Sequence, residues 1–301
     1  MRHVGSYREL YPTGELRRRA EEAKAHLDCC DLCAHECRVD RNRGRRGVCR
    51  TGPEIRVASY GPHFGEEEVL VGTGGSGTIF FSGCNLRCVF CQNWEISHLR
   101  EGVEISAEDL AEIMLELEAR GCHNLNLVTP TPYLPQILAA LELACGRGLS
   151  LPIVYNCGGY ESTAALSLLR GIVDIYMPDV KFAEEEVGRR LAGAGNYFDA
   201  VKLTLKEMHA QVGDLRIDED GLAWRGLLVR HLVLPGGLAG TERVLAFIAE
   251  EISRETYVNI MAQYFPHYRA RDYPPLDRPL AREEYREAMA IARRLGLTRL
   301  A

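Results

Sequence analysis

The chain has 301 residues, of which 46% are apolar and 26% are charged, and its 42 Asp and Glu outnumber its 36 Lys and Arg, which gives a formal net charge of −6. This length and apolar fraction exclude a disordered tail, a collagen-like repeat and a small disulfide-stapled domain, because they suffice for a real hydrophobic core. They indicate one large domain, with room for a small appendage.

The 11 cysteines need a chemical explanation, since a chain of this size does not depend on disulfides for its stability. The N-terminal segment MRHVGSYRELYPTGELRRRAEEAKAHL has no uninterrupted apolar run and shows no secretory signal. No stretch approaches the roughly 18 apolar residues of a membrane span. We therefore expect a cytoplasmic protein without a membrane partner, in a reducing compartment where clustered cysteines indicate metal or redox chemistry.

A charged helix is expected over residues 14–28, and a cysteine-rich stretch with little apolar periodicity follows it. Cys30, Cys33, Cys37 and Cys49 are spaced CxxCxxxC with one more cysteine further on, and four thiolates could close a structural zinc site or an auxiliary iron–sulfur cluster. Residues 1–50 carry 12 Lys and Arg against 8 Asp and Glu. Arginines among these cysteines are expected to balance thiolate charge, or else to contact nucleic acid. We expect residues 1–53 to form a small metal-binding extension ahead of a core domain at 54–301.

Residues 54–72 are expected to form short strands or a hairpin, after which strands and helices alternate. The six strand candidates are short apolar runs typical of a buried parallel sheet, at 78–82, 124–129, 153–156, 172–177, 227–234 and 257–262. Amphipathic helices are expected at 107–120, 134–145, 162–169, 184–191, 241–251 and 281–295, the first after a capping box of Ser106 and Asp109. This order predicts an α/β fold with a parallel sheet, either open or curled into a barrel.

The segment GCNLRCVFCQN, residues 83–93, follows the first strand of this alternation. Chance is a poor explanation for its CxxxCxxC spacing, which has an expectation of roughly 0.015 at this cysteine content. Three thiolates from Cys84, Cys88 and Cys91 can hold three irons of a 4Fe–4S cluster and leave one iron open, whereas an electron carrier would close all four positions. A zinc site completed by His98 is the alternative. The isolated Cys157 lies at the end of the third strand and is expected to face the same site.

With this motif the chain resembles the radical SAM superfamily, and more closely the pyruvate formate-lyase activating enzymes. The resemblance covers most of the chain and includes the N-terminal cysteine stretch, GCNLRCVFCQN, MPDVK at 177–181, KEMHAQVG at 206–213, RHLVLPG at 230–236 and MAQYFP at 261–266. It implies a partial (β/α)6 TIM-like barrel with a 4Fe–4S cluster and S-adenosylmethionine on its open iron. Reductive cleavage of this cofactor would yield a 5'-deoxyadenosyl radical that abstracts a hydrogen atom.

The resemblance also assigns roles to residues outside the cysteine motif. Asp179 and Lys181 match an active-site DxK at the end of the fourth strand, with a plain ion pair as the alternative. His231 would approach the nucleoside of the cofactor, or else is a buried and satisfied histidine. This chain departs from the family pattern at two cofactor-binding places. Thr129, in VTPTP, stands where the family has a GGE-like segment that meets the methionyl amino group. Neutral Asn156 stands where the family has an acid.

The implied substrate is a protein, such as a glycyl radical enzyme, and the implied electron donor is a low-potential protein such as flavodoxin or ferredoxin. We expect an oxidoreductase of this kind without a nucleic-acid partner. Two alternatives remain open at this stage. One is a radical SAM enzyme that modifies RNA or a small metabolite, with the arginine-rich segment as its docking surface. The other is a non-catalytic iron–sulfur or zinc protein.

Overall fold

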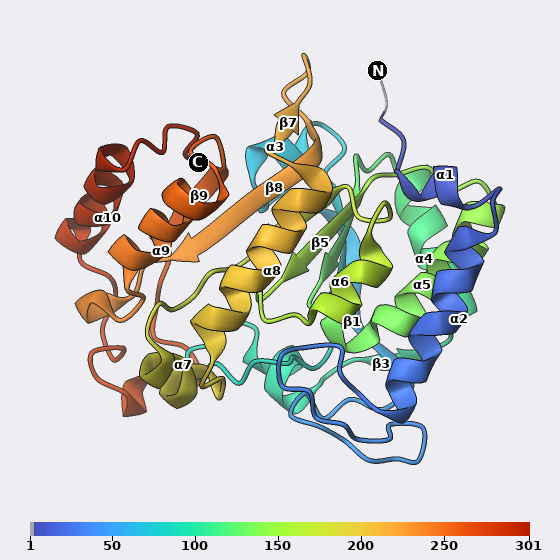
Figure 1. The fold of residues 1–301 in the computed structure, drawn as a ribbon, viewed down its shortest axis with the longest axis horizontal. Coiled ribbons are helices and arrows are strands. Elements are labelled where there is room, and N and C mark those ends of the chain that lie inside the picture. The colour runs from blue at the N-terminus through green and yellow to red at the C-terminus, as the bar shows by residue number, and fades with distance from the viewer. Residues whose placement is uncertain (1–2) are drawn as a thin grey trace.

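A computed structural model describes residues 3–301 as a mixed sheet covered by helices (Figure 1). The strand order is β3-β1-β2-β4-β5-β6-β8-β7, and β9 pairs with β8. The parallel strands are β2 (Ser76–Phe81), β4 (Leu125–Val128), β5 (Ile153–Cys157), β6 (Ile175–Pro178), β8 (Ala223–Leu232) and β9 (Tyr257–Met261). Each coincides with one of the predicted strands. The expected α/β fold with a partial (β/α)6 barrel is confirmed.

Antiparallel strands extend this parallel sheet at its edges. The first, β1 (Ile55–His63), pairs with β2 and with β3 (Val103–Ile105), and β7 (Arg216–Ile217) pairs with β8. The expectation of short strands or a hairpin over residues 54–72 is therefore corrected to one nine-residue strand followed by the helical turn α3 (Glu68–Val71). The turn forms because Leu70 packs against inward-facing residues of the parallel sheet, among them Val154, Ile175 and Leu228.

Helices connect successive parallel strands, as the sequence predicts. They are α4 (Ala107–Ala119), α5 (Leu134–Gly146), α6 (Thr163–Leu169), α7 (Glu185–Ala192), α8 (Tyr197–Val212) and α9 (Thr241–Phe247, extended by the π-helical segment Ile248–Ile252). The last helix, α10 (Arg282–Arg294), follows the final strand. The predicted capping box of α4 is present, since the Asp109 N–H donates to Ser106 Oγ (3.0 Å) and the Ser106 N–H donates to the Asp109 carboxylate (2.9 Å). The prediction missed α8.

The N-terminal part contributes α1 (Tyr7–Leu10) and the predicted helix, α2 (Glu15–Asp28), which packs against α5. The cysteine-rich loop that follows has no strand or helix. An isolated antiparallel β-bridge joins Cys33 of this loop to Glu161 of the barrel. In Figure 1 this loop lies at the lower edge of the molecule, beyond the end of α2. Buried side chains of α2 belong to the same hydrophobic core as the barrel. The expected domain boundary between residues 53 and 54 stays a prediction.

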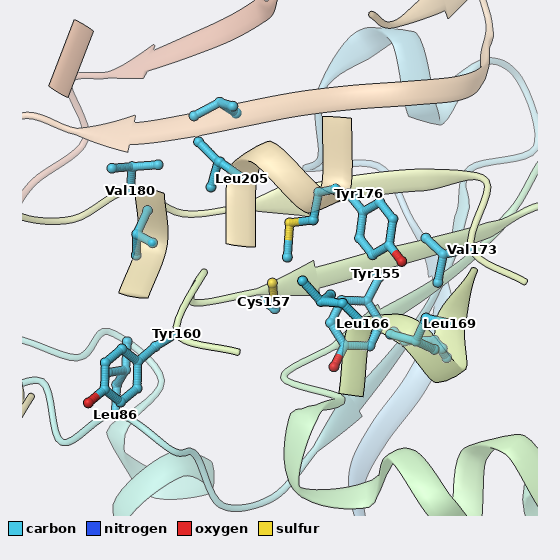
Figure 2. Close-up of a cluster of buried hydrophobic side chains, with 14 of the residues drawn as sticks. Leu86, Tyr155, Cys157, Tyr160, Leu166, Leu169, Val173, Tyr176, Val180 and Leu205 are labelled. Atoms are coloured by element: carbon cyan, nitrogen blue, oxygen red, sulfur yellow. The ribbon is translucent and has the colours of Figure 1, made fainter. Parts of the chain in front are cut away.

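The core fills the layer between the sheet and its outer helices. Figure 2 shows a part of it, in which Tyr155 and Tyr176 from neighbouring strands lie near Leu166 and Leu169 of α6, with Cys157 close by. The two tyrosine rings meet edge to face, with centroids 6.0 Å apart. No helix among residues 3–301 is both long and apolar enough to span a bilayer.

Candidate functional site

A cavity of about 290 Å³ opens at the carboxyl ends of the parallel strands. Residues that follow β2, β4, β5, β6 and β9, together with the end of β8, form its wall. This is the edge at which sites gather on parallel α/β scaffolds, because the loops there converge. Seven of the residues predicted for the site line this one cavity: Cys84, Cys88, Cys91, Thr129, Asn156, Asp179 and Lys181.

Backbone hydrogen bonds on several sides hold the loop that carries the three cysteines. The N–H groups of Arg87 and Val89 donate to carbonyls at the end of α7, each over 2.8 Å. The Asn85 side chain donates to the Tyr160 carbonyl over 2.8 Å. Gly83, which follows β2, has a φ of +87°, a conformation that glycine adopts without strain. These bonds fix the direction in which the loop leaves the strand.

The three thiols line the cavity, where Cys88 is buried and Cys84 and Cys91 are partly buried. Cys84 Sγ accepts from the Leu86 N–H over 3.3 Å, and Cys91 Sγ lies 3.1 Å from the Ser97 hydroxyl. Burial raises the pKa of Cys88 to about 12, although the Lys181 ammonium favours its thiolate. Buried thiols of this kind become thiolates only when a cation compensates their charge, as iron does.

A donor set of three thiols on one cavity wall fits a 4Fe–4S cluster held at three corners, with its fourth iron toward the cavity. As the side chains stand, no three His, Cys, Asp or Glu residues within 3–301 are arranged to hold a metal ion. The cluster assignment therefore rests on the chemistry of the donors and on their shared cavity.

His98, the alternative fourth ligand for zinc, supports the loop instead. Its Nε2–H donates to the Cys88 carbonyl over 3.0 Å, and its ring packs on Tyr268 with centroids 4.5 Å apart. The histidine is buried and is not part of the cavity wall. The structure therefore gives no support to zinc coordination by this side chain.

A network of charged side chains forms another part of the wall. Lys181 Nζ donates to Asp179 Oδ2 over 2.6 Å, and Arg230 Nε donates to Asp179 Oδ1 over 2.8 Å. Arg230 also donates to Asn156 Oδ1 (2.7 Å) and lies 3.4 Å from the Glu66 carboxylate. Burial opposes ionisation of Asp179, yet the two cations hold its pKa at about 2. The cavity therefore contains fixed charges at neutral pH.

Thr129 lies at the edge of the cavity in an uncommon backbone conformation. Its φ of +59° is in the left-handed region, which a β-branched residue rarely adopts. Its N–H donates to the Asn156 carbonyl over 2.9 Å, which holds the loops after β4 and β5 together. Strain of this kind persists where surrounding contacts impose it, and it occurs often at functional sites.

His231 lies away from the cavity, whereas its neighbour Arg230 lines it. His231 is fully buried, its Nδ1–H donates to the Val180 carbonyl (2.7 Å), and its Nε2 accepts from the Thr241 hydroxyl (3.0 Å). Burial lowers its pKa to about 4, so it is neutral. Successive strand residues face opposite sides of a sheet, and in β8 the arginine faces inward.

Glu161, which no sequence pattern singled out, belongs to the loop after β5 and is 1% exposed. Its carboxyl group accepts from the hydroxyls of Thr131 (2.9 Å) and Tyr155 (3.0 Å) and from the Cys157 thiol. Burial raises its pKa to about 7 despite these donors. Cys157 borders the cavity, as predicted, but its thiol interacts with this carboxyl group.

Comparison with known proteins gives three kinds of match. Residues 78–214 match the family model of the Radical SAM superfamily. Two similar curated proteins come from Methanocaldococcus jannaschii. Uncharacterized protein MJ0674 is 35% identical over 292 residues, which cover 93% of this chain and 78% of the relative. Uncharacterized protein MJ0808 is 23% identical over 266 residues, which cover 82% and 73%.

The crystal structure of Streptococcus suis SuiB bound to precursor peptide SuiA aligns with a TM-score of 0.44 and 13% identity. The alignment covers 70% of this chain and 44% of that chain.

Proposed function

The chain belongs to the radical SAM superfamily, and from that membership we propose that Cys84, Cys88 and Cys91 hold a 4Fe–4S cluster whose open iron binds S-adenosylmethionine. The observation that carries the proposal is the position of these three thiols on the wall of one cavity, which a network of fixed charges also lines. When bound, the two groups would supply reductive cleavage of the sulfonium to methionine and 5'-deoxyadenosine, the latter with a hydrogen atom taken from the substrate.

The residues of the chain would position these groups and keep solvent away. Phe90 packs edge to face against Phe182 and Tyr264, with ring centroids 6.0 Å away in both cases, and gives the cavity an apolar wall beside the cysteines. Exclusion of water protects a reactive radical from side reactions. The cavity volume of about 290 Å³ suits a ligand of small-molecule size.

The polar wall would orient the cofactor through charges that do not change near neutral pH. Asp179 stays ionised because Lys181 and Arg230 both contact it. Asn156, which replaces the acid of the activating enzymes, accepts from Arg230 and so helps to fix its guanidinium. Thr129 would offer backbone and hydroxyl oxygens to the methionyl amino group. A preorganised set of dipoles and charges of this kind requires little reorganisation during the reaction.

We further propose a protein substrate, specifically a glycyl radical enzyme from whose backbone glycine the hydrogen atom is taken. The support is the resemblance to the activating enzymes and the position of Phe265, which lines the cavity while 52% of its surface is exposed. An entering polypeptide would contact this ring. The electron would come from a cytoplasmic donor such as flavodoxin or ferredoxin.

The test of the reaction is anaerobic reconstitution with iron and sulfide, followed by dithionite and S-adenosylmethionine. We expect 5'-deoxyadenosine from the wild type and none from a Cys84→Ala, Cys88→Ala, Cys91→Ala variant. A wild type with a full cluster that gives no 5'-deoxyadenosine would refute the proposal.

The test of the substrate uses a glycyl radical enzyme labelled with deuterated glycine. We expect deuterium in the 5'-deoxyadenosine and a glycyl radical signal in the electron paramagnetic resonance spectrum. If 5'-deoxyadenosine forms without deuterium, the reaction stands and this substrate class is wrong.

A further inference from the structure

The four cysteines of the N-terminal loop lie near one another, in a segment that contacts the CxxxCxxC loop and is not part of the cavity wall. The Cys33 thiol interacts electrostatically with those of Cys37 and Cys49, and the Cys30 thiol interacts with that of Cys49. The loop folds back on itself, because the Cys30 N–H donates to the Val39 carbonyl (3.0 Å) and the Cys30 carbonyl accepts from the Arg38 N–H (2.8 Å). None of these cysteines lines the cavity.

A buried arginine lies beside this group. Arg41 is only 1% exposed, and its guanidinium donates to the Pro132 carbonyl (2.7 Å), to the Gly52 carbonyl and to the Cys30 thiol. Its Nε has no hydrogen-bond partner, and no carboxylate forms an ion pair with it in the part of the chain that the structure describes. Burying an unpaired charge costs several kcal/mol, by the order of magnitude seen in proteins.

The neighbouring arginines differ from Arg41 in this respect. Arg38 is exposed and contacts the carboxylates of Asp31 and Glu36, and Arg43 is exposed beside Asp40. Arg45, Arg46 and Arg50 are exposed as well, so among the arginines of residues 38–50 only Arg41 is buried, and it lies next to thiols without a carboxylate. The Arg41 guanidinium therefore needs a negative charge beside it. Cysteines acquire such a charge when they bind a metal as thiolates.

We propose that Cys30, Cys33, Cys37 and Cys49 form a closed tetrathiolate centre for zinc or an iron–sulfur cluster, with Arg41 as its internal counter-ion, and that this centre supports the CxxxCxxC loop from outside. Four thiolates satisfy either metal without an open position, so the centre does not bind S-adenosylmethionine. Binding requires the thiols to turn toward one common point. A net negative thiolate–metal centre would in turn stabilise the buried guanidinium.

Direct contacts connect this centre to the CxxxCxxC loop. His35, which lies between two of the four cysteines, donates from Nε2 to the Asn85 carbonyl over 2.8 Å, and its ring meets Tyr160 with centroids 4.9 Å apart. A side-chain carbon at Gly83 would lie 3.3 Å from the Cys49 carbonyl. Asn85 and Gly83 flank Cys84, so the two cysteine groups share one packed boundary.

The first experiment uses the full-length Cys84→Ser, Cys88→Ser, Cys91→Ser variant, purified anaerobically, so that the result does not depend on the proposed reaction. We expect it to retain about one zinc or about four irons per chain. Metal analysis with the visible spectrum distinguishes the two, and adding Cys33→Ser and Cys37→Ser should abolish the metal. A triple variant that binds neither metal, even after reconstitution with zinc or with iron and sulfide, would overturn the centre.

The second experiment tests Arg41 by measuring the affinity of the N-terminal cysteines for Co²⁺, which gives a charge-transfer band with thiolates. The metal-free Cys84→Ser, Cys88→Ser, Cys91→Ser variant is titrated with Co²⁺. We expect Arg41→Gln to weaken binding roughly 10–100-fold, the usual cost of losing a residue that supports metal ligands. Arg41→Lys keeps the charge and should stay closer to wild type, and Arg43→Gln is the exposed control. Circular dichroism reports whether each variant folds, and folded Arg41→Gln with unchanged affinity would overturn the counter-ion role.

The third experiment measures hydrogen exchange at residues 83–88 in the triple variant with and without the N-terminal metal. We expect the metal to slow exchange in this segment, and His35→Ala to reduce that protection while the metal stays bound. Equal exchange in the metal-free and metal-bound forms would refute the support of the CxxxCxxC loop.

Discussion

Glu161 should make the stability of the protein fall as the pH rises from acid to neutral. Below pH 4.5 the carboxyl is protonated in both the folded and unfolded chains. Above that pH it ionises in the unfolded chain first, because burial raises the folded pKa from 4.5 to about 7. The folded state then binds the extra proton, so the free energy of unfolding decreases until the folded pKa is passed. A shift of this size corresponds to about 3 kcal/mol.

The perturbation is Glu161→Gln, which keeps an oxygen for the Thr131 and Tyr155 hydroxyls but does not titrate. The assay is denaturant unfolding of metal-free wild type and variant at pH 4.5 and 7.5. We expect the difference in their unfolding free energies to change by about 3 kcal/mol in favour of the variant between these pH values. Glu283→Gln, at an exposed carboxylate, is the control with no such change.

An equal wild-type-to-variant difference at both pH values would refute this reasoning. It would mean that the hydrogen bonds from Thr131, Tyr155 and Cys157 offset the cost of burying the carboxylate, so that Glu161 is ionised in the folded protein throughout this range.

Three further substitutions test the cavity and the residues around it. Arg230→Met should lower the free energy of unfolding by about 3–5 kcal/mol in denaturant titrations, because it leaves the buried charge of Asp179 without one of its partners. His231→Leu should cost about 1–3 kcal/mol through its two lost hydrogen bonds, while the KM for S-adenosylmethionine stays unchanged; a raised KM in a stable variant would restore its cofactor role. Gly158→Ala should lower the free energy of unfolding by about 1–3 kcal/mol and reduce the iron retained per chain. The reason is that the added carbon would lie 2.7 Å from Leu86 Cδ1 on the CxxxCxxC loop. Full iron retention would show that the Leu86 side chain moves aside without disturbing the loop.

The parallel strands could be predicted from the sequence because they are short apolar runs, and β5 and β6 are buried on both faces. The CxxxCxxC motif followed from its spacing and its place after a strand, whereas Asp179 followed from the resemblance to the activating enzymes. Helix α8 was missed although Val201, Leu205, Met208 and Val212 recur at helical spacing, so its signal was present.

Other features depend on contacts that sequence patterns do not report. Choosing Arg230 over His231 requires knowing which face of β8 points inward. Glu161 is buried because the cysteine-rich loop crosses over it and pairs with it at Cys33, far away in the chain. Arg41 could not be distinguished from neighbouring arginines until the structure showed which of them is buried.

The helical turn α3 lies at the amino ends of the parallel strands, where the Leu70 carbonyl accepts from the Asn124 side chain and the Leu70 side chain packs with residues of β5, β6 and β8. In the proposed reaction, ligands would enter at the opposite end of the strands, where the cavity and the cysteines lie. We predict compulsory order in steady-state kinetics, with S-adenosylmethionine binding before the substrate. An inhibitor that binds at the mouth of the cavity would then prevent the cofactor from dissociating and the substrate from binding.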